Sequence, residues 1–422
     1  MSLTPSALEA DSRAYRIACT LAEAGFRSVV LEGRASRNRF WDDRLLVRSP
    51  GRAQSDSRSG AVLRPGRLRD AATSVRAGRL GRLGEAALYA GFRLHDRRRH
   101  VAAPRRLLPA ARLYYLHSFE MYRAVAPLAA RAGARIIYDA HDFYRGIVPP
   151  SEQCRFDRDR LRPFLDRLEN TLVDAADGVV TVSGGVAEMM CQTFGRRPAV
   201  IRNCHDARAD RVGGFDLRSA LRLAPEDRLC VVVGNCKPGM AVATAIAALA
   251  LLPERFHLAF LGRGYEAMAD ALPHDRLGNR AHLGYAVSPD EIVPAIRTAD
   301  LGLVIYEPIS ANYRDALPNG FFQIVAAGLP LVRAPLAEIE AAIGDCPVGI
   351  CLERLDAPTL AQAITRCAED DGTFRANAAA LARKLSWEFE AARLCRLVDH
   401  VLAANPASLP LQADSSLSWH RS

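Results

Sequence analysis

The chain has 422 residues, of which 49% are hydrophobic, and its formal net charge is +9. This length can bury two cores of ordinary domain size, whereas no stretch approaches the roughly 18 uninterrupted apolar residues of a membrane-spanning helix. The first residues lack the charged and apolar regions of a secretion signal, and the ten cysteines are scattered singly without a CxxC pair. The composition therefore predicts a cytoplasmic protein with reduced thiols.

The positive charge is concentrated in one segment. Residues 44–112 contain 17 arginines against four acidic residues, although the whole chain has only two lysines, Lys237 and Lys384. Within it, residues 69–99 intersperse arginines with leucines and Phe92. This pattern predicts either a basic amphipathic helix on an anionic membrane surface or a flexible, solvated insert. Nucleic-acid binding is disfavoured, because no aromatic stacking platform accompanies the charge.

Strand and helix patterns alternate along most of the chain, which indicates an α/β fold with parallel sheets. In the first half we predict helices over 14–24, 121–132, 161–175 and from about 183, and strands over 28–32, 113–116, 135–138, 178–182 and 198–203. In the second half we predict helices over 241–252, from 265, and over 289–298, 359–367 and 387–402, and strands over 229–233, 257–261, 281–283, 301–306 and 329–333. Two α/β units of similar size follow from this alternation.

Residues 310–330 carry the most informative pattern. A polar segment runs into Leu317-Pro318-Asn319, and a short helix follows before Gly328. Asn319 is expected to cap the helix and Gly328 to end it. The free amides of such a helix start can hold an anion, for example a nucleotide diphosphate.

This segment resembles the donor-binding signature of GT-B glycosyltransferases, in particular the large retaining family 4 group, whose usual form is close to N…LPNK-x-x-E-x-x-A-x-G-x-P. Other stretches resemble the same family in the same order, namely DSRAYRIACTLAEAGF, YYLHSFE, IIYDAHDFY, ADGVVTVS, VIRNCHD and LGYAVSPDEIVPAIRTADLGL. The resemblance covers about residues 9–402 apart from the arginine-rich insert. It implies a GT-B fold, with two Rossmann-like domains whose parallel sheets face an interdomain cleft.

The resemblance also implies the domain boundaries. We expect an acceptor-side domain over 1–206 with the basic insert 44–112, a linker over 207–225, and a nucleotide-sugar-binding domain over 226–385; a helix over 386–402 would cross back to the first domain, and 403–422 would be a disordered tail. Family members open with an apolar strand before the first helix. Here only residues 1–8 precede that helix, so we expect the strand to be lost or to lie upstream of the recorded start.

In the first domain, His141 stands at the end of a predicted parallel strand, where open α/β sheets place ligands. The matching family histidine approaches the donor sugar, so His141 is predicted to be catalytic; a structural histidine that bonds a loop carbonyl is the alternative. Asp139 and Asp142 flank it and could orient the ring or meet an acceptor hydroxyl. His117, at the end of the preceding strand, is a weaker candidate.

In the second domain, the family places an arginine and a lysine after the first strand, and here the stretch is Gly234-Asn-Cys-Lys-Pro-Gly. Lys237 matches the lysine and is predicted to contact phosphate, whereas Asn235 replaces the arginine. The family's paired acids, spaced E-x7-E, are here Asp315 and Gln323, and the signature lysine is Gly320. A neutral amide at position 323 would weaken the contact with the ribose by about 1 kcal/mol. The predicted catalytic residues are thus His141 and Asp315, and the predicted substrate-binding residues are Gly234, Lys237, Pro318, Asn319, Gly320, Phe321 and Gln323.

The implied reaction transfers a hexose from a nucleoside diphosphate sugar to a hydroxyl acceptor, a glycan, a polysaccharide or a lipid-linked sugar, with retention of configuration and without a metal or redox cofactor. The D-x-D pattern at Asp157 and Asp159 is discounted as a metal site because it does not follow a strand, and 262–264 is expected to be a tight turn. We expect a cytoplasmic enzyme that can be peripheral on the inner face of the membrane. Two alternatives remain: a catalytically degenerate GT-B scaffold, and a nucleotide-sugar epimerase.

Overall fold

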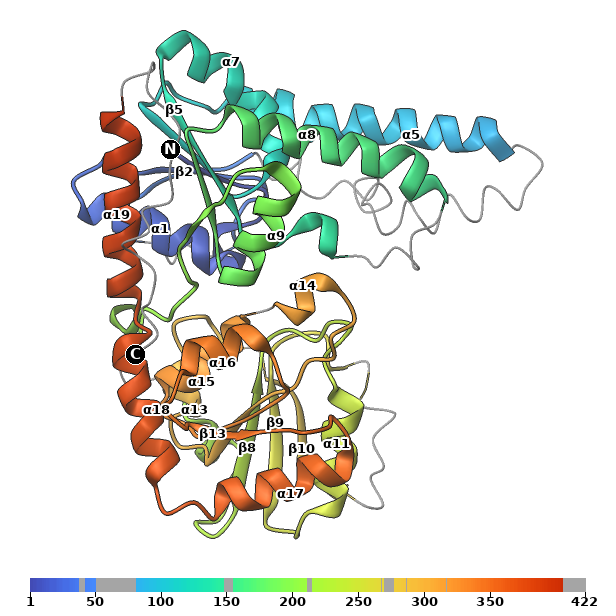
Figure 1. The fold of residues 1–422 in the computed structure, drawn as a ribbon, viewed down its shortest axis with the longest axis vertical. Coiled ribbons are helices and arrows are strands. Elements are labelled where there is room, and N and C mark those ends of the chain that lie inside the picture. Colours follow the sequence, from blue (N-terminus) through green and yellow to red (C-terminus); the bar gives the residue numbers. More distant parts are fainter. Residues whose placement is uncertain are drawn as a thin grey trace. The chain divides into compact units, whose positions relative to one another are not determined.

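The computed structural model describes residues 1–37, 42–50, 81–147, 155–210, 215–266, 268, 277–285, 287–315 and 317–404. The chain divides into two compact units. The first comprises Met1–Val182, Ala187–Ile201 and Ala391–Ser422, and the second comprises Ser183–Val186 and Arg202–Glu390. Each unit is built on one parallel sheet with helices on both of its faces (Figure 1), as the alternation in the sequence predicts. No helix in the described part of the chain is long and apolar enough to span a bilayer.

The sheet of the first unit has the strand order β3-β2-β1-β4-β5-β6-β7, and all neighbours are parallel. Its strands are β1 Ser2–Thr4, β2 Val29–Glu32, β3 Leu46–Arg48, β4 Leu113–Leu116, β5 Arg135–Ala140, β6 Gly178–Thr181 and β7 Ala199–Val200. Its helices are α1 Ser12–Glu23, α5 Gly81–Arg97, α6 Ala103–Arg105, α7 Tyr122–Ala132, α8 Arg162–Ala175, most of α9 Gly184–Phe194, and the part of α19 (Trp387–Ala403) that follows Glu390. The order reverses between β1 and β4, which is the point where such sheets bind ligands.

The expectation that the first strand is missing was wrong. Residues Ser2–Thr4 form β1, which pairs with β2 on one side and β4 on the other and is buried throughout. The strand has only three residues, and two of them are polar, so no apolar run marks it in the sequence. Leu3 is nevertheless fully buried, and this short strand occupies the centre of the sheet.

The sheet of the second unit has the order β10-β9-β8-β11-β12-β13, again parallel throughout. Its strands are β8 Arg228–Val233, β9 Phe256–Leu261, β10 Ala281–Tyr285, β11 Leu301–Val304, β12 Leu331–Arg333 and β13 Gly349–Cys351. Its helices are α10 Leu217–Ala220, α11 Val242–Leu251, α13 Ile292–Ile296, α14 Ala311–Arg314, α15 Asn319–Ala326, α16 Ala337–Ile343, α17 Ala357–Ala368 and α18 Thr373–Lys384. Counted within the unit, this is the 3-2-1-4-5-6 order of a Rossmann sheet, with its switch point between β8 and β11.

Strand β8 packs against helices on both faces of this sheet. Leu229, Val231 and Val233 point into a core with α13, α15 and α18, whereas Cys230 and Val232 point into a second core with α11 and α17. A strand that is buried on both faces is apolar at every position, which is why the sequence shows a continuous run here rather than an alternation.

The expected linker is part of the second unit. Residues Ala207–Ala209 form a short 3₁₀ helix and α10 follows; Leu217 of α10 is fully buried in the core with β8. The described residues of the expected linker over 207–225 thus group with the second unit, and Leu217 is the apolar side chain that docks them on its core. The tail from 405 and most of the helix predicted from residue 265 lie outside the described residues.

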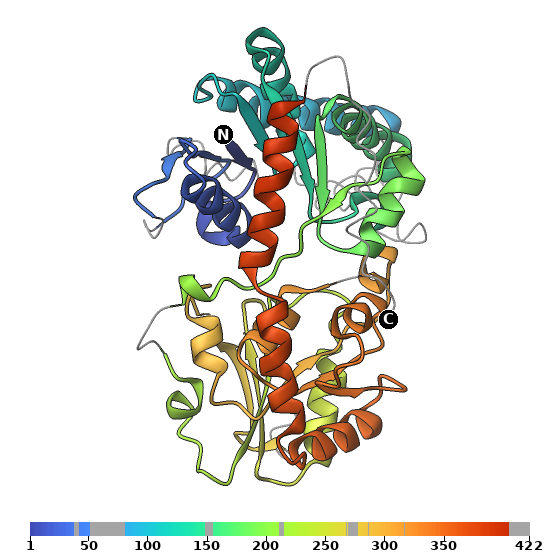
Figure 2. The ribbon, with the colours of Figure 1, turned by 60° about the vertical axis from the view of Figure 1, so that its left-hand side comes forward.

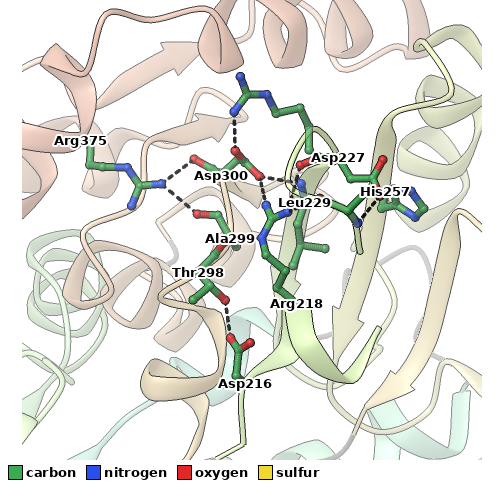
Figure 3. Close-up of polar contacts among 11 residues, drawn as sticks. Asp216, Arg218, Asp227, Leu229, His257, Thr298, Ala299, Asp300 and Arg375 are labelled. Atoms are coloured by element: carbon green, nitrogen blue, oxygen red, sulfur yellow. Dashed lines mark hydrogen bonds and ion pairs between the residues drawn. The ribbon is translucent and has the colours of Figure 1, made fainter. Parts of the chain in front are cut away.

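Asp300 precedes β11 and lies at the amino ends of strands β8 and β11 in the second sheet (Figure 3). Its carboxylate accepts hydrogen bonds from Arg218 Nη2 at 2.6 Å, from Arg228 Nη1 at 2.8 Å and from the backbone N–H of Leu229 at 2.8 Å. Arg375 of α18 donates to the backbone oxygens of Ala299 and Asp300. This network ties α10, β8, β11 and α18 together at the edge of the sheet opposite to the ligand-binding edge, so it serves the fold.

The basic insert contains a helix that packs on the protein. Helices α5 and α8 lie side by side (Figures 1 and 2), and Phe92 of α5 is buried against Phe156, Leu161 and Phe164. The rings of Phe92 and Phe164 meet edge to face at 5.9 Å, and the Arg93 guanidinium lies 4.0 Å from the Phe164 ring centroid. Phe92 and the partly buried Leu88 are therefore covered by the protein, whereas Leu94 of the same helix is 51% exposed. Residues 51–80 lie outside the described part.

Candidate functional site

The carboxyl edge of the second sheet is shaped by backbone segments that approach each other closely. A Cβ on Gly262, which follows β9, would overlap the carbonyl oxygen of Gly234, which follows β8. A Cβ on Gly320, in the first turn of α15, would overlap the carbonyl oxygen of Val233. The start of α15 thus lies directly against the end of β8. The loop that follows β8 and the start of the signature helix therefore lie at the same switch point of the sheet.

Lys237 lies in this loop and is exposed. Its Nζ is 5.4 Å from the ring centroid of Tyr306, which follows β11, and 5.4 Å from that of Tyr313 in α14. The Tyr313 hydroxyl donates a 2.6 Å hydrogen bond to the carbonyl oxygen of Pro238 and so joins α14 to the loop. Within the described residues Lys237 forms no ion pair, and its cation is therefore free to bind an anionic ligand.

Asn235 has a structural role in the same loop. Its side-chain oxygen accepts a 3.0 Å hydrogen bond from the backbone N–H of Arg263, and the Tyr265 hydroxyl donates at 2.8 Å to the carbonyl oxygen of Gly234. The turn over 262–264 is tight, as predicted, with Gly262 at φ +155° and Gly264 at φ +92°. Asn235 closes this turn where the family pattern would supply a second positive charge.

The signature helix α15 begins differently from the prediction. Pro318 occupies the cap position with an extended backbone, and Asn319 is the first helical residue. The Asn319 side chain instead accepts a hydrogen bond from Asn203 Nδ2. The cap assignment was therefore wrong, because Asn319 is engaged by a residue that is distant in sequence. Among the described residues no side chain caps the helix start, which leaves it open toward an anion.

The remaining signature residues divide between core and surface. Phe321 is fully buried and packs edge to face on Phe322 at 5.3 Å, so its side chain belongs to the core, and the predicted contact with the substrate would have to be made by its backbone. Gln323 is half-buried, and Asp315, at the end of α14, is half-buried as well. Gly328 ends the helix as predicted, with φ +70°.

The carboxyl edge of the first sheet gathers polar groups that follow β1, β4 and β5. Asp11 caps α1: its carboxylate accepts from the backbone N–H of Ala14 at 3.0 Å and from the Thr4 hydroxyl at 2.6 Å. Burial raises the pKa of Asp11, but nearby His117 and His141 and these two hydrogen bonds lower it more, so the net shift is downward. The carboxylate of Asp11 therefore lies close to His117 and His141 at this edge of the sheet.

His117 and His141 differ in their surroundings. His117 is 1% exposed, and neither ring nitrogen has a hydrogen-bond partner among the described residues; its Nδ1 lies 3.6 Å from Asp139 Oδ2. Burial lowers the pKa of His117, so the neutral ring is favoured. His141 is half-buried and faces the ring of Tyr144 edge to face at 6.3 Å. Of the two, His141 is the one open to a substrate.

Asp139 is committed to a buried ion pair that sequence reasoning missed. Arg13 of α1, 4% exposed, donates from Nε and Nη2 to the two carboxylate oxygens of Asp139 at 2.9 Å each, and it also donates to the carbonyl oxygen of Ile201. The Tyr115 hydroxyl adds a 3.2 Å bond to Asp139. Asp139 is therefore unable to meet an acceptor hydroxyl. In a chain with so many arginines, nothing in the sequence singles out Arg13.

The D-x-D pattern lies in a π-helical turn, Asp157–Leu161, rather than at a strand end. Asp157 is buried, whereas Asp159 is exposed and pairs with Arg155 at 2.9 Å. The two carboxylates differ in their surroundings, so this pattern gives no support to a metal site.

Comparison with known proteins agrees with the fold described above. Residues 11–208 match the family model described as Glycosyltransferase Family 4. No curated protein sequence matches the chain significantly. Among solved structures, sucrose-phosphate synthase from Thermosynechococcus elongatus is 16% identical, with 92% of each chain covered and a TM-score of 0.63. A UDP-forming α,α-trehalose-phosphate synthase from Burkholderia xenovorans is 13% identical, with 96% of this chain and 99% of that chain covered and a TM-score of 0.64.

A third structure, the Anabaena protein HepE in complex with UDP-glucose, is 16% identical, with 94% of this chain and 98% of that chain covered and a TM-score of 0.60. Structural similarity at these identities establishes the fold, and the family model matches residues 11–208. The resemblance seen in the sequence is thereby confirmed: the protein is a glycosyltransferase with the GT-B fold, and its residues 11–208 match Glycosyltransferase Family 4.

Proposed function

We propose that the protein transfers a hexose from a nucleoside diphosphate sugar to a hydroxyl acceptor, with retention of configuration and without a metal. The observation that carries this proposal is the position of Lys237. This cation, unpaired within the described residues, lies in the loop after β8, whose last residue, Val233, contacts the start of α15. A lysine and free helix amides are the groups that bind a diphosphate. HepE, which shares the fold, was solved with UDP-glucose bound.

In this proposal catalysis rests on positioning and on stabilising the charge of the leaving diphosphate. Lys237 and the amides at Asn319 and Gly320 would hold the diphosphate, and Gln323 would meet the ribose through its amide. His141 and Asp315 would orient the sugar. A diphosphate oxygen would take the proton from the incoming hydroxyl on the face where the glycosidic bond breaks, so no dedicated carboxylate nucleophile is required.

Binding of the donor tests the proposal. Thermal shift with UDP-, GDP-, ADP- and dTDP-sugars is expected to show one donor class that stabilises the wild type, and Lys237→Ala is expected to abolish the shift. Lys384→Ala is a matched control, because Lys384 is the other lysine of the chain and is exposed at the end of α18. No stabilisation by any donor would contradict the proposal and favour a degenerate GT-B scaffold. Interconversion of donor sugars without an acceptor would favour an epimerase.

We further propose a glycan, polysaccharide or lipid-linked acceptor and a peripheral position of the enzyme on the inner face of the cytoplasmic membrane. The support is the exposed arginine surface of the basic insert, which includes Arg93, Arg97 and Arg98. Since Phe92 is buried against Phe164 of α8, we expect the described part of this helix to contact a bilayer mainly through its arginines. Sedimentation with phosphatidylglycerol vesicles is expected to carry the protein down at low salt and to fail at 1 M salt; equal sedimentation with neutral vesicles would contradict this.

A further inference from the structure

The loop that carries His141 is anchored to α8 by two arginines. Arg162 of α8 donates to the carbonyl oxygen of Arg145 at 2.8 Å and to that of Tyr144 at 3.4 Å. Arg145 reaches back to α8 and donates at 2.6 Å to the side-chain oxygen of Asn170. The loop following β5 is thus held from both sides, only a few residues after His141.

Glu169 of α8 lies next to Tyr138 of β5 and to Arg145 of the loop that follows β5. It is 2% exposed, and its Oε1 accepts a 3.0 Å hydrogen bond from the hydroxyl of Tyr138, which lies on β5 three residues before His141. Its Oε2 is 3.7 Å from Arg145 Nε, and Oδ1 of the more exposed Asp166 is 3.5 Å from the same nitrogen. That nitrogen is buried and has no hydrogen-bond partner among the described residues. Glu169 therefore touches the strand that precedes His141 and faces the arginine that follows it.

A second contact links the anchor to the histidine. Tyr144, next to Arg145, packs edge to face on Phe119 at 5.0 Å and on His141 at 6.3 Å. The guanidinium of Arg145 also stacks on Phe194 of α9, 4.7 Å from the ring centroid. A shift of Arg145 would move the neighbouring Tyr144 and with it the ring against which His141 lies.

We propose that Glu169 is a positioning residue: together with Tyr138 and Arg145 it fixes the loop that presents His141, and its ionised form draws Arg145 into place. The inference rests on the proposed transferase function, in which His141 meets the sugar. Burying a carboxylate on the inner side of a helix costs stability unless a partner compensates it. Arg145 is that partner only while Glu169 is charged, so the anchor depends on pH.

The charged groups around Glu169 define this dependence. Burial raises the pKa of Glu169 to about 7; the hydrogen bond from Tyr138 and the charges of Arg145 and Arg162 counteract part of that rise, whereas Asp166 adds to it. Tyr144, on the same loop, interacts with Asp142 and Glu120 as well as with Glu169. Glu169 thus loses its proton in the neutral range, and its attraction for Arg145 grows as the pH rises through that range.

Steady-state kinetics of the full chain against pH test the proposal, with the donor sugar found by thermal shift. For the wild type, kcat is expected to rise about tenfold from pH 6 to pH 8, as for one group that titrates near 7. Glu169→Gln keeps an acceptor for Tyr138 but removes the charge, so its kcat should be low and flat with pH, while KM for the donor stays unchanged. Asp174→Asn, an exposed carboxylate on the same helix, should retain the wild-type profile.

A readout that needs no activity separates this inference from the proposed function. The Nε–H signal of Arg145, assigned in NMR spectra with Arg145→Lys, should shift as Glu169 ionises between pH 6 and pH 8 in the wild type, and this step should vanish in Glu169→Gln. A Glu169→Gln variant with the wild-type kinetic profile and the wild-type Arg145 shifts would overturn the inference. A wild type that is inactive with every donor, yet shows the Arg145 step, would refute the transferase and leave the anchor standing.

Discussion

Replacing Asp300 by asparagine tests whether the polar network at the amino edge of the second sheet holds that unit together. The carboxylate accepts three hydrogen bonds, from Arg218, Arg228 and the backbone of Leu229, at 2.6 to 2.8 Å (Figure 3). Asparagine keeps one acceptor oxygen and no charge. Arg218 retains its bonds to the carbonyl oxygens of Thr298, Ala224 and Asp227, which limits the loss.

Hydrogen bonds to charged groups contribute about 1.5–3 kcal/mol each, and a broken ion pair costs about 3–5 kcal/mol when it is fully buried. Asp300 is 17% exposed and Arg228 is 42% exposed, so screening reduces that cost. We expect Asp300→Asn to lower the free energy of unfolding of the second unit by about 3 kcal/mol.

The assay is urea unfolding followed by circular dichroism, combined with hydrogen exchange of peptides from β8 and β11, which report on this unit alone. Asp345→Asn, at an exposed site in the same unit, serves as the control and should change little. A loss below about 1 kcal/mol for Asp300→Asn, or equal losses for both variants, would refute the reasoning.

Three further predictions concern stability. The pKa of Glu169 is raised to about 7, so its contribution to stability is present below its ordinary pKa of about 4.5 and is lost as the pH rises through 7. We therefore expect Glu169→Gln to raise the free energy of unfolding by at most about 3 kcal/mol at pH 8 and to change it little at pH 5, as measured by urea titration. Burial and the neighbouring His257 lower the pKa of His282 to about 4, so stability should be lost as the pH falls from about 6.5 toward 4, and His282→Gln should flatten this part of the curve; an unchanged acid limb would contradict it. Gly320→Ala should cost about 1–3 kcal/mol and weaken donor binding, since its Cβ would displace the start of α15 from Val233; unchanged melting and binding would show that the helix start tolerates the shift.

Much of the fold follows from patterns that sequence alone displays. The strands that are buried on both faces, such as β8 and β9, appear as apolar runs of five and four residues. Helices α16 and α18 were missed, and so were three strands that are short or polar. Strand β1 has three residues, β3 lies in the arginine-rich insert, and β13 has three residues with an exposed end.

The candidate sites divide in the same way. Lys237 and His141 were predicted because strand ends and the family pattern mark them, and the structure places both at the carboxyl edges of their sheets. Arg13 and Glu169 were missed, because the sequence does not reveal which charged residues of a helix are buried. Phe321 was predicted from its motif position, and the motif does not reveal that its side chain fills the core.

The most direct test of the proposed function is the release of nucleoside diphosphate from the donor sugar in the presence of acceptor. His141→Ala is expected to reduce the rate at least 100-fold, on the order of the effect of removing a group that positions and stabilises the reacting centre. His400→Ala, an exposed histidine on α19, should leave the rate unchanged. Equal rates in the wild type and in His141→Ala would contradict the assignment of this edge of the first sheet to catalysis.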